Sequence, residues 1–157
     1  LFYFEIEPLS GRLRYLNAGH NPPFVLRASG LESLKASAIP LGMMTGTTYA
    51  EGELRLHPGD ALVVYSDGLT EARNAGDEEF GADRLGALMP RRRGLPAEQG
   101  GRQIMEEVND FLGGERPHDD LSLVVLARPG AAAAAPGPAA PAGVTPPPKV
   151  TPPPLPT

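Results

Sequence analysis

The chain has 157 residues, a formal net charge of −5 and no cysteine. The acidic balance argues against a nucleic-acid partner, which would require a dense basic surface. Without cysteine, a bound metal would be held by carboxylate, histidine or backbone oxygen, a set that favours Mg²⁺ or Mn²⁺ over structural zinc. No apolar run reaches the roughly 20 residues of a membrane span, and no signal peptide is visible, so we expect a cytoplasmic segment without membrane contact.

Two regions differ in composition, with a boundary between residues 128 and 129. Residues 1–128 are mixed and are predicted to form the folded part. Residues 129–157 hold 11 of the 19 prolines and almost no large apolar side chain, which predicts a disordered proline-rich tail. The alternative for this tail is a polyproline II docking site, because it contains P-x-x-P spacings.

Strand patterns dominate the first half of the folded part. The predicted strands are Leu1–Glu7, Arg12–Asn17, Phe24–Arg27, Leu31–Lys35, Tyr49–Leu56 and Ala61–Tyr65. Turn sequences such as PLSG and HPGD separate them. The run ALVVY at Ala61–Tyr65 is apolar without alternation, which predicts a central strand covered on both faces. The first strand begins at Leu1 without a polar lead-in, and this favours a missing upstream segment, where a sensor domain or a membrane anchor would lie.

Two helices and one further strand are predicted in the second half. Ala82–Met89 reads as a short helix that Pro90 closes. Apolar residues recur at helical spacing within Ala97–Leu112, and Gly113 ends that helix. Leu121–Ala127 is a second continuous apolar strand. Many strands, two helices and one strand predict an α+β domain with an antiparallel sheet, and argue against an alternating βαβ fold.

Acidic residues adjoin the two most apolar strands. Asp67 follows Ala61–Tyr65 directly in the sequence SDG, and Asp119 and Asp120 precede the last strand. If the two strands are antiparallel neighbours, about 5 Å apart, these carboxylates meet at one edge of the sheet. Like charges so close repel unless a cation or a proton lies between them, and Gly68 leaves room for a hard divalent ion. Spacing alone leaves open that Asp67 belongs to a simple turn and that Asp119 caps a strand.

Five motifs occur in an order that resembles a known family. They are NAGHNPP (17–23), IPLGM (39–43), LHPGDALVVYSDGLTEARN (56–74), EEFGADRL (78–85) and DDLSLVVL (119–126). Together they closely resemble the second half of the SpoIIE-like bacterial branch of the PPM-type metal-dependent serine/threonine protein phosphatases, over essentially all of residues 1–128. Each motif alone is weak, whereas five in the family's order are specific.

The resemblance implies a fold, a cofactor and an activity. The implied fold is an antiparallel β-sandwich flanked by helices, with two Mn²⁺ or Mg²⁺ ions at one end. Matched by position, Asp67 and Asp119 are the metal-binding aspartates, Gly68 belongs to the same metal motif, and Asp120 is a supporting or alternative ligand. Family members hydrolyse phosphoserine or phosphothreonine on proteins by means of a metal-activated water, without a covalent phospho-enzyme.

The resemblance also implies a partner, and one departure limits the site. The usual substrate in this branch is a phosphorylated regulatory protein, an anti-sigma-factor antagonist. The family's upstream aspartate motif has no match here, since the only Gly-His pair is Gly19-His20. We therefore expect the chain by itself to be inactive. Two other interpretations stay open, namely a non-catalytic phosphatase-like scaffold in a signalling pathway and a plain β domain whose aspartates only form turns.

Two further features have competing interpretations. His20 lies in the AGHNPP loop, where it would either contact the rim of the active site or only stabilise its own turn. The run Arg91–Arg93 would either meet an acidic protein or be solvated, and the solvated interpretation is favoured.

Overall fold

The computed structural model describes residues 1–130. Its strands are β1 (Phe2–Ile6), β2 (Arg12–Asn17), β3 (Phe24–Arg27), β4 (Gly30–Ser33), β5 (Gly52–Arg55), β6 (Ala61–Tyr65) and β7 (Leu123–Ala127). Its helices are α1 (Asp67–Thr70), α2 (Ala82–Leu88), the 3₁₀ helix η1 (Met89–Arg92) and α3 (Ala97–Leu112). All seven predicted strands are confirmed, although several are shorter than their apolar patterns. The proline-rich segment 131–157 lies outside the described residues.

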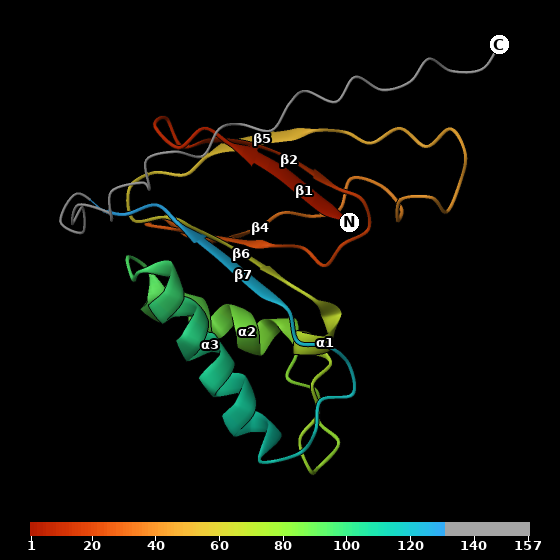
Figure 1. The fold of residues 1–157 in the computed structure, drawn as a ribbon, viewed down its shortest axis with the longest axis vertical. Coiled ribbons are helices and arrows are strands. Elements are labelled where there is room, and N and C mark those ends of the chain that lie inside the picture. Colours follow the sequence, from red (N-terminus) through yellow and green to blue (C-terminus); the bar gives the residue numbers. More distant parts are fainter. Residues whose placement is uncertain (131–157) are drawn as a thin grey trace, which may run out of the picture.

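The strands form two antiparallel sheets that face each other (Figure 1). The smaller sheet has the order β1-β2-β5, and the larger has the order β4-β3-β6-β7. Every neighbouring pair is antiparallel, as the sequence pattern predicts. Strands β6 and β7 are adjacent in the larger sheet, although α1, α2, η1 and α3 lie between them in the chain. These helices pack on the outer face of the larger sheet.

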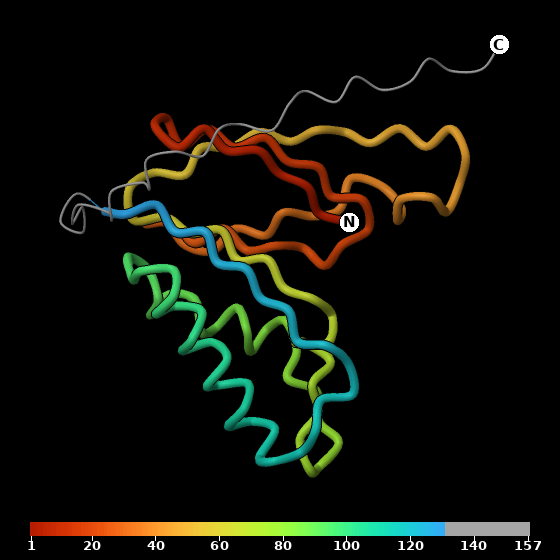
Figure 2. The backbone as a smooth tube through the Cα atoms, in the orientation of Figure 1, coloured from red at the N-terminus to blue at the C-terminus, as the bar shows by residue number. Residues whose placement is uncertain are grey.

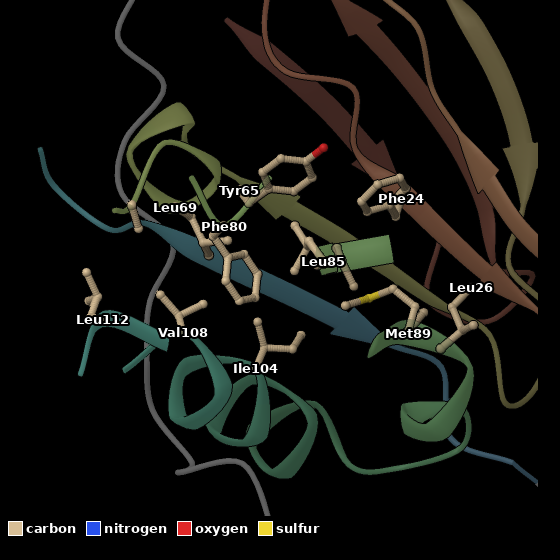
Figure 3. Packing of buried hydrophobic residues seen from close by; sticks show 13 residues of the cluster. Phe24, Leu26, Tyr65, Leu69, Phe80, Leu85, Met89, Ile104, Val108 and Leu112 are labelled. Atoms are coloured by element: carbon tan, nitrogen blue, oxygen red, sulfur yellow. The ribbon is translucent and has the colours of Figure 1, made fainter. Parts of the chain in front are cut away.

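Strand β6 separates two apolar clusters, as expected for a strand covered on both faces. Alternate side chains of a strand point to opposite faces of its sheet. Leu62 therefore packs between the two sheets with Leu13 and Val25. Val63 and Tyr65 point the other way, into a larger cluster under the helices (Figure 3). The buried members from the helices are Leu69, Leu85, Met89, Ile104, Val108 and Leu112, and the loop between α1 and α2 adds Ala72 and Phe80.

The helical region departs from the prediction at Pro90. Helix α2 ends at Leu88, but the chain continues as a 3₁₀ helix through Pro90. Proline is tolerated there because it lies in the first turn, where its missing N–H would have no helical partner. Helix α3 ends as predicted, with Gly113 in the left-handed conformation at φ 61°. Within residues 1–130, no helix combines the length and the hydrophobicity that crossing a bilayer requires.

The solvated interpretation of the arginine run is wrong for Arg92. Its side chain is 7% exposed and donates from Nη1 to the carbonyl oxygen of Leu88 at 2.6 Å. Nη2 lies 3.3 Å from a carboxylate oxygen of Glu107, which ties η1 to α3. Arg91 and Arg93 are exposed, as expected.

Candidate functional site

The antiparallel pairing of β6 and β7 brings the two predicted acidic positions to one end of the larger sheet. In the β6–β7 register, Tyr65 lies opposite Leu123. Ser66 extends the pairing, because its N–H donates to the carbonyl oxygen of Ser122 at 3.0 Å and its hydroxyl accepts from the N–H of Ser122 at 3.0 Å. The hydroxyl also donates to the carbonyl oxygen of Asp120 at 2.9 Å. Ser66 therefore fixes the start of α1 against the Asp119–Asp120 segment.

Gly68 is the point of closest approach between these two segments. A Cβ at this position would lie 2.6 Å from the carbonyl oxygen of Asp120 and 3.3 Å from the Cβ of Asp119. No side chain fits in that space without displacing backbone. The glycine that was predicted to admit an ion is therefore also required for the two acidic segments to meet.

The carboxylates themselves are exposed and make local hydrogen bonds. Oδ1 of Asp67 accepts from the N–H of Gly68 at 3.0 Å, and Oδ1 of Asp119 accepts from the N–H of Asp120 at 2.7 Å. Each aspartate uses one oxygen in this way. Within residues 1–130 the other oxygen of each has no hydrogen-bond partner, so each carboxylate retains capacity to bind a cation.

An open pocket of about 350 Å³ lies beside Gly68 and Asp119. The loop between α1 and α2 and the loop between α3 and β7 run side by side here (Figure 2). The pocket is lined by Gly68, Glu71, Arg73, Asp77, Glu79, His118 and Asp119. Asp67 and Asp120 are not among these lining residues.

Sequence reasoning missed Arg73 and its two acidic partners. Arg73 donates to a carboxylate oxygen of Asp77 at 2.9 Å and to one of Glu79 at 2.6 Å. The hydrogen bond from Arg73 holds the pKa of Asp77 below its ordinary value, and the same bond raises the pKa of Arg73. The pairs are exposed, so they contribute little to stability. They place one guanidinium group and two carboxylates at the pocket wall.

The AGHNPP loop lies at the same end of the molecule, because the hydroxyl of Tyr65 donates to the carbonyl oxygen of Pro22 at 3.0 Å. Within the loop, the side chain of Asn17 accepts from the N–H of His20 at 2.8 Å and donates to the carbonyl oxygen of Leu34 at 3.1 Å. Nδ1 of His20 lies 2.8 Å from the carbonyl oxygen of Asn21. These contacts agree with a turn-stabilising role for His20, which does not line the pocket beside Asp119.

The acidic residues at this end carry donors of the kind that bind a metal ion. The carboxylates of Asp67 and Asp119 suit a hard divalent cation, which prefers oxygen ligands. Within residues 1–130, however, no three histidine, aspartate or glutamate side chains lie close enough together to hold a metal ion. The donor set therefore fits a portion of a coordination shell and does not complete one.

Comparisons with known structures define the class of the fold. The chain aligns with the phosphatase domain of the cell fate determinant SpoIIE from Bacillus subtilis at a TM-score of 0.63 and 20% identity, over 82% of this chain and 56% of that one. It aligns with the SiaA-PP2C domain of Pseudomonas aeruginosa at a TM-score of 0.65 and 18% identity, over 75% and 47%. The two sheets with their covering helices thus have the PP2C, or PPM-type, phosphatase fold, and the predicted α+β fold is confirmed.

Sequence comparison gives the family. The profile described as Stage II sporulation protein E (SpoIIE) matches residues 1–129, and the chain belongs to this family. It is 33% identical to Protein IcfG of Synechocystis sp. over 129 residues, which are 82% of this chain and 20% of IcfG. It is 28% identical to the phosphoserine phosphatase RsbU of Bacillus subtilis over 133 residues, which are 82% of this chain and 38% of RsbU. The chain thus spans well under half of each curated relative.

Proposed function

We propose that these residues act within a metal-dependent protein serine/threonine phosphatase. The observation that carries the proposal is the close approach of Gly68, which directly follows Asp67 in the chain, to Asp119 and to the carbonyl oxygen of Asp120. Membership of the SpoIIE family and similarity to a phosphoserine phosphatase support the same activity.

Asp67 and Asp119 would hold the divalent ions, with Asp120 as a supporting ligand, and Gly68 of the same motif would let the two acidic segments approach each other. Mn²⁺ or Mg²⁺, when bound, would neutralise charge on the phosphoryl oxygens and make a water more acidic. Ser66 would position Asp119 by fixing the backbone of the next residue. Arg73 would offset the charge of its two acidic neighbours, so that the pocket stays accessible to an anionic substrate. His20 remains a candidate for a contact at the rim.

The proposed substrate is a phosphorylated regulatory protein of the anti-sigma-factor antagonist type. Two similarities support this choice. One is to RsbU, a phosphoserine phosphatase. The other is to the RsbU and RsbW domains of Rv1364c from Mycobacterium tuberculosis, with a TM-score of 0.60 and 26% identity over 80% of this chain and 34% of that one. We place the reaction in the cytoplasm, where such regulators of transcription act.

We further propose that the 157-residue chain is inactive by itself. Within residues 1–130, no three acidic or histidine side chains are grouped so that they could hold a metal ion. The remaining 27 residues contain no aspartate, glutamate, histidine or cysteine that could supply one. The same observation favours the second candidate function, a non-catalytic domain that binds a phosphoprotein without hydrolysing it.

A phosphatase assay with Mn²⁺ and a phosphoserine protein separates these functions. The chain alone should release no phosphate. A longer enzyme that adds the family's upstream aspartate motif should hydrolyse the phosphoserine protein. In that enzyme, Asp67→Asn should lower the rate by about a thousandfold, since a metal ion supplies several kcal/mol of charge stabilisation. Asp83→Asn, an exposed substitution in α2, serves as the control and should leave the rate unchanged. Full activity with Asp67→Asn would refute the ligand assignment, and an inactive longer enzyme would favour the binding domain.

A further inference from the structure

A second pocket lies at the other end of β6, away from the aspartates. It has a volume of about 500 Å³ and is lined by Arg27, Ala28, Ser29, Arg55, His57, Asp60 and Arg93. Two turns form its walls, one between β3 and β4 and the other just before β6. The five residues of β6 separate it from Asp67 by about 16 Å at the rise of an extended strand.

The one acidic residue of this pocket is already neutralised. Asp60 is buried, and its Oδ2 accepts from the N–H of His57 at 2.9 Å and pairs with Nη1 of Arg27 at 3.3 Å. Arg27 also donates from Nη1 to the carbonyl oxygen of Arg55 at 2.8 Å and from Nε to Glu32 at 2.8 Å. The guanidinium of Arg27 is therefore held rigidly, and within residues 1–130 its Nη2 has no hydrogen-bond partner.

Several other donors around the pocket are unused. Arg93 is exposed and has no hydrogen bond or ion pair among the described residues, and its Nη2 lies 3.4 Å from where a Cβ of Gly59 would be. Arg55 uses Nε to donate to the carbonyl oxygen of Ser10 at 2.8 Å, which leaves its two terminal nitrogens available. The imidazole of His57 is exposed and carries at least one N–H in either tautomer.

The charges around the pocket differ in sign from the chain as a whole. Three arginines and one aspartate line it, and Glu32 pairs with Arg27 beside it, so that 3 − 2 gives a local charge of +1, on a chain whose net charge is −5. Side-chain entropy and mutual repulsion would normally disperse three guanidinium groups, yet here two of them are fixed by hydrogen bonds to backbone carbonyls. A pocket wall with one fixed guanidinium group and two that have no acidic partner among residues 1–130 has the chemistry of an oxyanion site.

We propose that this pocket, called here the Arg93 pocket, binds a phosphoryl group through Arg27, Arg55, His57 and Arg93. A phosphoryl group carries close to two negative charges and several acceptor oxygens, which matches donors that approach from different sides better than a planar carboxylate does. The group could come from free phosphate or from a phosphorylated side chain. Because the pocket is separate from the aspartates, the inference does not depend on the proposed phosphatase activity.

The test is a titration of the 157-residue chain with inorganic phosphate at low ionic strength and with EDTA present. Amide chemical shifts measured by NMR report the binding. EDTA removes divalent ions, so the end of the molecule that holds Asp67 has no metal with which to bind phosphate. We expect saturable shifts at the amides of His57 and Gly59, and little change at Gly68. Arg93→Gln should weaken binding about tenfold, because a hydrogen bond to a charged group contributes about 1.5 kcal/mol or more. Since Arg93 makes no hydrogen bond or ion pair within residues 1–130, the Arg93→Gln variant should keep the native NMR spectrum.

The matched control is Arg14→Gln, which removes the same charge from the outer face of the smaller sheet, where Arg14 pairs with Glu5. Its affinity for phosphate should stay within about twofold of the unmodified chain. A parallel titration with a phosphoserine peptide identifies the source of the phosphoryl group. Tighter binding of the peptide than of phosphate, with the same amide shifts, indicates a phosphorylated side chain. Equal or weaker binding of the peptide indicates free phosphate. The proposal is overturned if His57 and Gly59 show no saturable shifts, or if Arg14→Gln weakens binding as much as Arg93→Gln.

Discussion

The Cβ of Asp119 lies 3.3 Å from the position that a Cβ on Gly68 would occupy, although the two residues are 51 positions apart in sequence. This approach exists because β6 and β7 are antiparallel neighbours and because Ser66 continues their hydrogen bonding past the last paired residues. The contact involves no large side chain. The close fit at Gly68 is therefore the feature of the site most sensitive to a single added methyl group.

Gly68→Ala should destabilise the fold by about 1–3 kcal/mol, because the added carbon would collide with the backbone carbonyl of Asp120. The matched control is Gly100→Ala in α3, where a Cβ would meet no heavy atom within 4 Å. That control should be neutral or stabilising by up to about 1 kcal/mol, since alanine has the higher helix propensity. Urea unfolding of both variants gives the comparison. Equal stabilities would show that the acidic segments do not approach as closely as described.

Tyr65 should make the stability of the fold fall at alkaline pH. Burial raises the pKa of Tyr65 above its ordinary value of 10.0, and its hydroxyl donates to Pro22. A group whose pKa is raised in the folded state contributes stability that is fully present below the unfolded pKa and is lost as pH rises through the folded pKa. The loss should therefore begin near pH 10. Melting temperatures measured from about pH 9 to pH 11 should decline less steeply for Tyr65→Phe. An identical decline in both proteins would exclude Tyr65 as the cause.

Arg92→Ala should destabilise the fold by about 2 kcal/mol, although Arg92 belongs to a run of three arginines. The substitution removes the hydrogen bond to Leu88 and the link to Glu107, and it leaves a gap under η1. Arg91→Ala, one residue earlier and exposed, should change the free energy of unfolding by no more than about 0.5 kcal/mol. Chemical denaturation measures both. If the two variants were equally stable, the result would contradict the burial of the Arg92 side chain.

The sequence predicted the elements whose patterns are local. The predicted bounds are correct for Arg12–Asn17, Phe24–Arg27 and Ala61–Tyr65, because turn residues such as Gly and Pro flank these strands in the sequence. Other strands were predicted too long. Tyr49–Leu56 shrinks to Gly52–Arg55, because alternation of polar and apolar residues continues beyond the last backbone pairing.

The parts that sequence reasoning missed depend on tertiary contacts. Helix α1 begins at Asp67, in a sequence that reads as a turn, and it exists because Leu69 packs into the core below the sheet. Arg73, Asp77 and His118 come to one pocket from two loops, and no spacing rule joins them. His118 alone had a usable signal, since it directly precedes Asp119.

Binding of Mn²⁺ to the 157-residue chain tests the assignment of the aspartates most directly, because it requires no turnover. Paramagnetic broadening of amide NMR signals reports which groups the ion approaches. We expect the amides of Gly68 and Asp120 to broaden first, and Asp67→Asn or Asp119→Asn to remove that broadening, while Asp83→Asn leaves it in place. The account would be contradicted if the first signals to broaden lay in another acidic segment, such as Glu106–Asp110 in α3, or if neither aspartate substitution changed the pattern.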